Sequence, residues 1–140
     1  MELVRSVSGV RGVFGQTLSG ETAASYVTAF AEHCRAQKIV VGRDARASGP
    51  ALTEAVLEAL RLAGVTAVDL GLCATPAVQV AVEETAADGG LVLTASHNPA
   101  PWNGLKFISA AGTFLGPADV EAVFAGADRG GVPAASRSGS

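Results

Sequence analysis

The chain has 140 residues, 49% of them hydrophobic, so it can bury the core of one ordinary domain. Its net charge of −3 provides no basic stripe to neutralise a phosphate backbone, which argues against a nucleic-acid partner. A membrane span needs about 18 consecutive apolar residues, and no apolar run is that long. The first residues do not have the pattern of a signal peptide. We therefore expect a cytoplasmic protein without a membrane partner.

Helix and strand patterns alternate along the first two thirds of the chain. Residues 20–36 carry apolar side chains at helical spacing after Ser19, a suitable cap, and residues 38–42 form a short apolar strand. A second helix begins at Ser48 and ends at Gly64, a residue type that suits the C′ position. Three further elements are expected: a strand over 65–70, a helix from Thr75 and Pro76 to about residue 86, and a strand over 89–93.

The last third of the chain contains a hairpin, a helix and a tail. Residues 105–108 and 113–115 are apolar segments on either side of Ala110-Ala111-Gly112, which predicts a hairpin. A final helix begins at Pro117. Residues 127–140 are rich in Gly, Ala and Ser and lack periodicity, so we expect a linker or a disordered end.

Repeated β-α units of this length predict an α/β fold. We expect a three-layer sandwich over residues 1–126, in which a mixed, mostly parallel sheet has helices on both faces and the hairpin adds an antiparallel element. Cys34 and Cys73 are too few for a disulfide framework or a zinc site, so both are expected to be reduced thiols.

A polar turn follows the predicted strand over 89–93. It reads Thr94-Ala95-Ser96-His97-Asn98-Pro99, and Asn103-Gly104-Leu105-Lys106 follows after a short gap. Open α/β sheets bind ligands beyond the carboxyl ends of their strands, so Ser96 is a candidate active-site group. By position alone, a serine there is more often a cap or turn residue than a nucleophile.

Two other motifs precede this turn. One is Ser8-Gly9-Val10-Arg11-Gly12, and the other is Gly42-Arg43-Asp44-Ala45-Arg46-Ala47-Ser48-Gly49, which lies ahead of a predicted helix. Together with the serine turn, and in this order, the motifs resemble those of the α-D-phosphohexomutases, the family of phosphoglucomutase, phosphomannomutase and phosphoglucosamine mutase. The resemblance covers roughly residues 3–126 and corresponds to the first domain of that family.

The resemblance implies an intramolecular phosphotransferase that interconverts hexose 1-phosphates and 6-phosphates. Ser96 matches the serine that carries a phosphate, passes it to a sugar monophosphate and takes a phosphate back from the other end of the bisphosphate. A serine hydroxyl can carry such a covalent intermediate, and the charge on the moving group requires fixed donors, cations and a metal ion. A phosphate oxygen on Ser96 would ligate Mg²⁺, and an activator of the glucose 1,6-bisphosphate type is implied.

Four other residues match the family's site. Lys106 matches the lysine of the Asn-Gly-x-Lys element and Arg11 the arginine of the N-terminal loop; in the family both lie near the phosphoserine, to assist proton transfer or hold the phosphoryl group. His97 and Asn98 match loop residues that shape the site, with His97 assigned to catalysis and Asn98 to phosphate binding. Without the resemblance, Lys106 reads as a solvated lysine at a sheet edge, and Arg11 as part of a flexible glycine loop that could cradle an anion.

Family members have four domains, and the sequence contains segments of the first only. The aspartate-rich loop that holds Mg²⁺, the sugar-reading loop and the loop for the distal phosphate belong to the other three. We therefore expect a hexose phosphate substrate, domains 2–4 of the same parent chain as partners, and little turnover by this chain alone. The start departs from the frequent Gly-Thr-x-Gly-x-Arg-Gly, which keeps the phosphoglucosamine mutase branch open.

Other classes were weighed against this interpretation. A serine hydrolase is rejected because Ser96 and the adjacent His97 cannot easily form a relay and no G-x-S-x-G elbow is present. Residues 9–15 read G-x-x-G-x-x-G, which does not match the dinucleotide fingerprint. A non-catalytic phosphosugar-binding module stays open. For the charged cluster at 43–46, we favour local ion pairs that pin the loop over direct phosphate binding.

Overall fold

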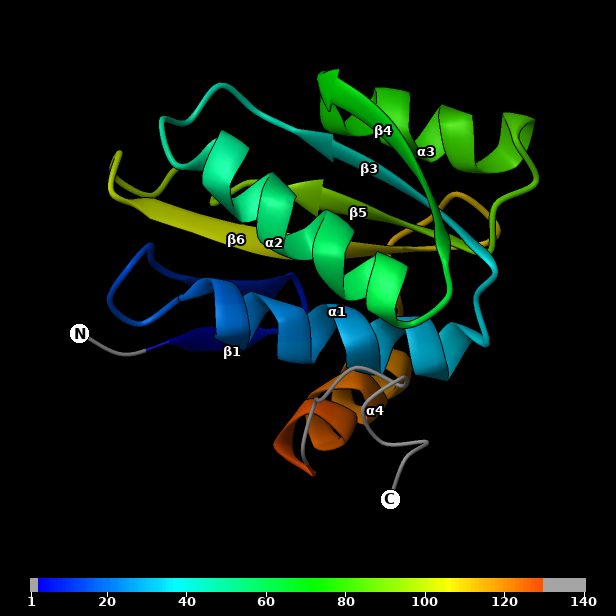
Figure 1. The fold of residues 1–140 in the computed structure, drawn as a ribbon, viewed down its shortest axis with the longest axis horizontal. Coiled ribbons are helices and arrows are strands. Elements are labelled where there is room, and N and C mark those ends of the chain that lie inside the picture. Colours follow the sequence, from blue (N-terminus) through cyan, green and yellow to red (C-terminus); the bar gives the residue numbers. More distant parts are fainter. Residues whose placement is uncertain (1–2, 130–140) are drawn as a thin grey trace.

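The computed structural model describes residues 3–129 and contains a six-stranded sheet with four helices (Figure 1). The strands are β1 Val4–Ser6, β2 Gly9–Val13, β3 Lys38–Arg43, β4 Thr66–Leu72, β5 Gly89–Leu93 and β6 Trp102–Ser109. The helices are α1 Gly20–Cys34, α2 Gly49–Leu62, α3 Thr75–Glu84 and α4 Pro117–Asp128. Within residues 3–129, no helix combines the length and the apolar character needed to cross a membrane.

The sheet is mixed, with the strand order β1-β2-β6-β5-β3-β4. Strand β3 runs parallel to β4 and to β5, whereas β6 is antiparallel to β5 and to β2, and β1 is antiparallel to β2. Four strands, β2 to β5, therefore point in one direction, and β1 and β6 point in the other. The predicted α/β class with a mixed sheet is confirmed.

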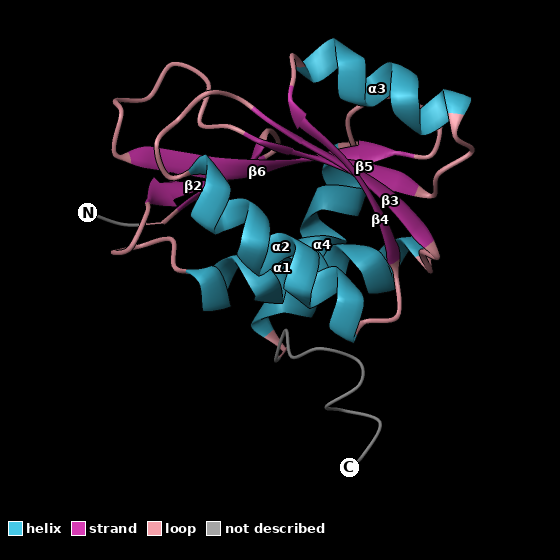
Figure 2. Cartoon of the chain, turned by 45° about the horizontal axis from the view of Figure 1, so that its top comes forward, coloured by secondary structure: helices cyan, strands magenta, loops and turns pink. Residues whose placement is uncertain are grey.

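Helices cover the two faces of the sheet unequally. Figure 2 shows α1, α2 and α4 on one face and α3 alone on the other. The larger core lies under the three helices and includes Phe30, Leu52 and Leu91, all fully buried. The smaller core joins α3 to β3 and β5 through Val40, Val78 and Val82 among others. The predicted three-layer arrangement is thus present, and the α3 layer covers only part of its face.

The helix starts follow the sequence with one local difference. Ser19 caps α1, because its hydroxyl accepts a hydrogen bond from the Thr22 amide at 3.1 Å. Ser48 stands in front of α2 as predicted, but its hydroxyl accepts from the Asn103 side-chain amide at 2.8 Å instead of capping the helix. Cys34 and Cys73 are free, as expected, and burial is the main cause that raises the pKa of the Cys34 thiol to about 11.

The N-terminal hairpin was not predicted. Arg11 lies in strand β2, directly opposite Gly104 of β6, so its assignment to a flexible glycine loop was wrong. The segment is short and rich in glycine, and the strand that orders it comes some ninety residues later in the chain. Such a long-range pairing leaves no local periodicity in the sequence.

The predicted hairpin near residue 110 is only partly correct. The first segment belongs to the long strand β6, but residues 113–115 form no strand and make one bridge, from Phe114 to Ile108. Because β6 lies between β2 and β5, Lys106 is not at a sheet edge. Helix α4 extends to Asp128, two residues into the predicted tail, and residues 130–140 lie outside the described range.

Candidate active site

The serine turn lies where the loops after β3 and β5 meet. These strands are parallel neighbours, and the Asp44 amide after β3 donates a hydrogen bond to the Leu93 carbonyl at the end of β5, at 3.2 Å. The chain reaches β4 through α2 on one face and returns to β5 through α3 on the other, so β3 and β5 flank a switch point of the kind that binds ligands in open α/β sheets. Because β6 is antiparallel, its first residues lie at the same edge.

Ser96 has an unusual backbone. Its φ of +55° places it in the left-handed region, which costs a residue with a Cβ roughly 1–2 kcal/mol. Two local hydrogen bonds hold the turn: the Ser96 amide donates to Thr94 Oγ1 at 2.9 Å, and the Asn98 amide donates to the Ala95 carbonyl at 3.0 Å. Within residues 3–129, no hydrogen bond engages the Ser96 hydroxyl, which is therefore available for chemistry.

Arg11 joins the serine turn from strand β2. Its Nη1 donates to the Asn98 side-chain oxygen at 3.0 Å, across 87 residues of sequence. Gly104 makes this contact possible: a Cβ there would lie 2.8 Å from the Thr94 carbonyl oxygen and 3.1 Å from Arg11 Cγ. The glycine of the Asn-Gly-x-Lys element thus leaves room for the Arg11 side chain and for the strand end that leads to Ser96.

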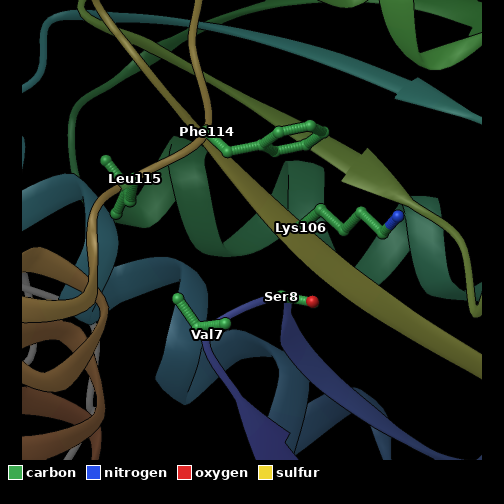
Figure 3. Close-up of a pocket in the computed structure, with 5 residues that line it drawn as sticks. All are labelled: Val7, Ser8, Lys106, Phe114 and Leu115. Atoms are coloured by element: carbon green, nitrogen blue, oxygen red, sulfur yellow. The ribbon is translucent and has the colours of Figure 1, made fainter.

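Lys106 lies on the same face of the sheet as Arg11, two residues along β6 from Gly104. Its ammonium group lies 5.7 Å from the centre of the Phe114 ring. A pocket of about 230 Å³ adjoins it, with Val7 and Ser8 on one side and Phe114 and Leu115 on the other (Figure 3). No hydrogen bond within residues 3–129 links Lys106 to the serine turn. The structure therefore places Lys106 on the same face of the sheet as Arg11, without a hydrogen bond to the serine turn among the described residues.

His97 takes no part in these hydrogen bonds. It is exposed, and within the described range its ring forms no hydrogen bond. Of the predicted site residues, Arg11 and Asn98 are in direct contact, Ser96 and His97 share their turn, and Lys106 stands apart on the same sheet face.

Arg46 is a site residue whose contacts the sequence did not indicate. From the loop after β3 it donates to the carbonyls of Ser96, Asn98, Pro99 and Trp102, at 2.8 to 2.9 Å. The predicted local ion pair is also present, with Arg46 Nε 3.4 Å from Asp44 Oδ2. The motif of alternating charges predicted the ion pair, but every residue has a carbonyl, so nothing in the sequence indicated these acceptors.

A metal site was tested against the side chains present. Within residues 3–129, no group of three or more His, Cys, Asp or Glu residues is arranged to hold a metal ion. A phosphate on Ser96 could supply one oxygen, whereas Mg²⁺ requires near-octahedral oxygen coordination. These residues do not by themselves fit a Mg²⁺ site.

Comparison with known proteins identifies close similarity over most of the chain. Residues 3–131 match the family model described as phosphoglucomutase/phosphomannomutase, alpha/beta/alpha domain I. A phosphoglucosamine/phosphogalactosamine mutase of Sulfurisphaera tokodaii is 44% identical over 71% of this chain and 22% of its own length. A phosphoglucomutase/phosphomannomutase of Thermococcus kodakarensis is 38% identical over 76% of this chain and 25% of its own length.

Structural comparison agrees with the sequence comparison. The crystal structure of a phosphoglucomutase/phosphomannomutase family protein from Burkholderia thailandensis superposes with a TM-score of 0.76 and 32% identity, over 90% of this chain and 31% of that one. The chain thus spans about a quarter of the length of the curated relatives that it matches.

Proposed function

The chain belongs to the phosphoglucomutase/phosphomannomutase family as its alpha/beta/alpha domain I, and from this premise we propose that Ser96 carries the phosphate of a phosphohexomutase. The whole enzyme would interconvert hexose 1-phosphate and hexose 6-phosphate through a bisphosphorylated sugar. The observation that carries the proposal is the Ser96 turn itself: a left-handed serine with an unengaged hydroxyl, held at the switch point of the sheet.

In this proposal the group moves between two oxygens. The phosphoserine loses its phosphoryl group when a sugar hydroxyl attacks phosphorus: a sugar O–P bond forms, the Ser96 O–P bond breaks, and the proton of the sugar hydroxyl ends on the serine oxygen. The reverse step, from the other end of the bisphosphate, restores the phosphoserine. Apart from forming and breaking the Ser96 O–P bond, the protein would promote both steps by positioning the reacting groups and stabilising their charge.

The surrounding side chains supply fixed donors and positive charge. Arg11 is held by Asn98 beside the turn, and Lys106 places a second cation on the same face of the sheet. We propose that both balance the charge of the phosphoryl group and that Asn98 contributes to phosphate binding. His97 is adjacent and exposed, and we propose that it shapes the entrance to the turn and assists catalysis.

Mg²⁺ enters the proposal only as a partner of the phosphoserine. When bound, it would neutralise charge on the phosphoryl oxygens, and its remaining ligands would come from outside the residues described here. For the same reason we propose that this chain alone has little mutase turnover and that it works with domains 2–4 of a parent chain. An activator of the glucose 1,6-bisphosphate type and a cytoplasmic location belong to the same proposal.

The sugar stays open between glucose, mannose and glucosamine phosphates. The mutases of Sulfurisphaera tokodaii and Thermococcus kodakarensis are named for different sugar phosphates and are similarly identical to this chain, so the glucosamine branch stands as an alternative. A non-catalytic module that binds a phosphosugar through Arg11, Ser96 and Lys106 is the alternative from another class.

The test is covalent labelling of the serine. The natural full-length protein is treated with phosphatase, incubated with glucose 1,6-bisphosphate and mapped by mass spectrometry. We expect phosphate on Ser96, no labelling of Ser96→Ala, and normal labelling of Ser25→Ala, a matched change at a half-buried serine of α1 whose hydroxyl donates to the Glu21 carbonyl. A wild-type protein that binds the bisphosphate but leaves Ser96 bare would favour the binding module.

A further inference from the structure

We propose that Arg46 is a positioning residue, which holds the serine turn in its reactive shape without touching the reacting atoms. The inference rests on the proposed function, because it assigns Arg46 a part in the chemistry of Ser96. It does not follow from the motif Gly42-Arg43-Asp44-Ala45-Arg46, where a phosphate-binding arginine and an ion-paired arginine would look alike.

The guanidinium of Arg46 makes contacts on every nitrogen. Nη2 donates to the carbonyls of Ser96 and Asn98, both at 2.9 Å. Nη1 donates to the carbonyls of Pro99 and Trp102, at 2.8 and 2.9 Å. Nε lies 3.4 Å from Asp44 Oδ2 and forms an ion pair with this carboxylate, but among the described residues it makes no hydrogen bond. The two Nη nitrogens are fully engaged with carbonyls, and Nε, which has no hydrogen-bond acceptor within residues 3–129, is buried beside Asp44, so the side chain is not placed to bind a phosphate directly.

The four carbonyls span the whole turn. They belong to the peptide after Ser96, to two positions of the loop and to the first residue of β6. One planar group therefore fixes both ends of the segment that carries the serine, and the side chain that does so is only 12% exposed. A turn held in this way cannot rotate the Ser96 peptide without losing contacts elsewhere.

Arg46 is itself anchored. Its amide donates to Asp44 Oδ1 at 3.3 Å, and its carbonyl accepts from the Gly49 amide at 2.9 Å, at the start of α2. The Asp44 amide in turn donates to the Leu93 carbonyl at the end of β5. The position of the clamp is therefore set by the sheet and by α2, so it can impose a geometry on the loop.

The strained conformation of Ser96 gives this clamp its purpose. A left-handed serine persists only where surrounding contacts outweigh its strain, and the two contacts within the turn involve the amides of Ser96 and Asn98. Arg46 holds the carbonyls of the same two residues, which belong to the peptide groups that follow them. Since the direction of the hydroxyl follows the backbone, loss of the clamp should displace the phosphoryl group from in-line geometry.

Lysine cannot replace arginine in this role. Its ammonium group has three donors on one atom, whereas the planar guanidinium has five donors in a fixed fork. The clamp therefore predicts that Arg46→Lys behaves much like Arg46→Ala. If Arg46 acted through its charge alone, Arg46→Lys would keep most of the activity.

The experiment compares variants of the natural full-length protein with glucose 1-phosphate as substrate. We expect Arg46→Lys to lower kcat on the order of 100-fold with KM unchanged, because substrate binding does not use this side chain. Arg61→Lys is the matched control, since Arg61 is exposed on α2 and, among the described residues, pairs with Glu58 alone; it should leave both constants unchanged. Circular dichroism and the melting temperature check that each variant is folded.

The outcomes separate this inference from the proposed function. A wild-type Ser96 that glucose 1,6-bisphosphate cannot phosphorylate would overturn the proposed function. Two results would overturn the clamp alone, provided that the wild type is phosphorylated normally. One is a wild-type kcat in Arg46→Lys; the other is a rise in the KM of Arg46→Lys as large as the fall in its kcat. Asp44→Asn provides a milder test through the anchor and should lower kcat less than Arg46→Lys. If both variants unfold, Arg46 stabilises the domain as a whole and the positioning role is wrong.

Discussion

The two halves of the sheet differ in how they are covered. In the parallel half, made by β5, β3 and β4, helices pack on both faces of β3 and β5, and β5 is buried along its whole length, whereas the outer strand β4 is mostly exposed. In the antiparallel half, made by β1, β2 and β6, helices α1 and α4 cover one face. The opposite face carries Arg11 of β2 and Lys106 of β6, and within residues 3–129 no helix covers β2 on that face. Val4 of β1, which pairs with Arg11 of β2, is 44% exposed.

The buried strands of the parallel half are expected to determine stability, and the accessible face of the antiparallel half is expected to serve the proposed activity. Burial of apolar area is the main source of folding free energy, and β3 and β5 of the parallel half are buried on both faces. The antiparallel half leaves one face accessible, and two of the proposed site residues lie on it. The serine turn connects β5 to β6 and therefore joins the two halves. We expect substitutions to affect stability on one side of this junction and activity on the other.

The largest effect should come from the core of the parallel half. Leu91 on β5 is fully buried, and Leu91→Ala removes its packing and leaves a cavity, at a cost of about 2–5 kcal/mol. Urea unfolding of the 140-residue chain measures the loss. Leu72→Ala on the outer strand β4, where the leucine is 60% exposed, is the control and should change stability by less than about 0.5 kcal/mol. Equal costs at the two positions would contradict the assignment of the core.

The second effect lies at the junction of the halves. Gly104→Ala would place a Cβ against the Val10 carbonyl oxygen of β2 and 2.8 Å from the Thr94 carbonyl oxygen, so both neighbouring backbones must move away from β6, at a cost of about 1–3 kcal/mol. The same shift should disturb the Arg11 contact with Asn98 and reduce labelling of Ser96. Gly116→Ala is the control, because no atom lies within 4 Å of its Cβ position and its φ is −71°. Urea unfolding and Ser96 labelling are measured together, and a stable Gly104→Ala with normal labelling would contradict this role.

The same division explains what could be predicted from the sequence. The parallel half follows from local signals: α1, β3, α2 and β5 all fall within a few residues of their expected bounds. Helical periodicity and short apolar runs are properties of neighbouring residues, so they are visible in the chain. Strands β1 and β2 were missed because their order depends on pairing with β6, far along the sequence.

The site shows the same limit. The motif around Ser96 predicted the turn and its neighbours, and its resemblance to a family supplied the roles. The contact between Arg11 and Asn98 joins two motifs that are 87 residues apart and needs the folded sheet to exist. The Arg46 contacts use backbone carbonyls, which leave no pattern in the sequence. Lys106 and Ser96 were expected close together, yet within residues 3–129 no hydrogen bond links the lysine to the serine turn.

The third effect concerns the accessible face of the antiparallel half. Arg11→Ala removes a half-buried side chain with one hydrogen bond, so the loss of stability should be about 1 kcal/mol, well below that of Leu91→Ala. The rate at which glucose 1,6-bisphosphate labels Ser96 should fall strongly, although the free energy of unfolding changes little. A double-mutant cycle with Asn98→Ala isolates the contact, and additive single effects would show that Arg11 acts independently of Asn98.

The smallest effect lies at the outer edge of the antiparallel half, where Arg5 of β1 joins α4. Its guanidinium pairs with both oxygens of Asp128, at 2.7 and 3.1 Å, and lies 4.6 Å from the centre of the Phe124 ring. The hydrogen bonds from Arg5 hold the pKa of Asp128 below its ordinary value. Because the carboxylate is exposed, Asp128→Asn should lower the melting temperature only slightly at pH 7.

The pH dependence of this pair decides whether charge or packing holds the edge. A depressed folded pKa contributes stability that is complete above the pKa of the unfolded carboxyl, about 3.8, and is lost as the pH falls through the lower folded value. The difference in melting temperature between wild type and Asp128→Asn should therefore be present at pH 7, shrink with added salt, and disappear in strong acid. A difference that survives in acid would mean that the substitution acts through something other than the charge of Asp128, and the electrostatic account of this edge would be wrong.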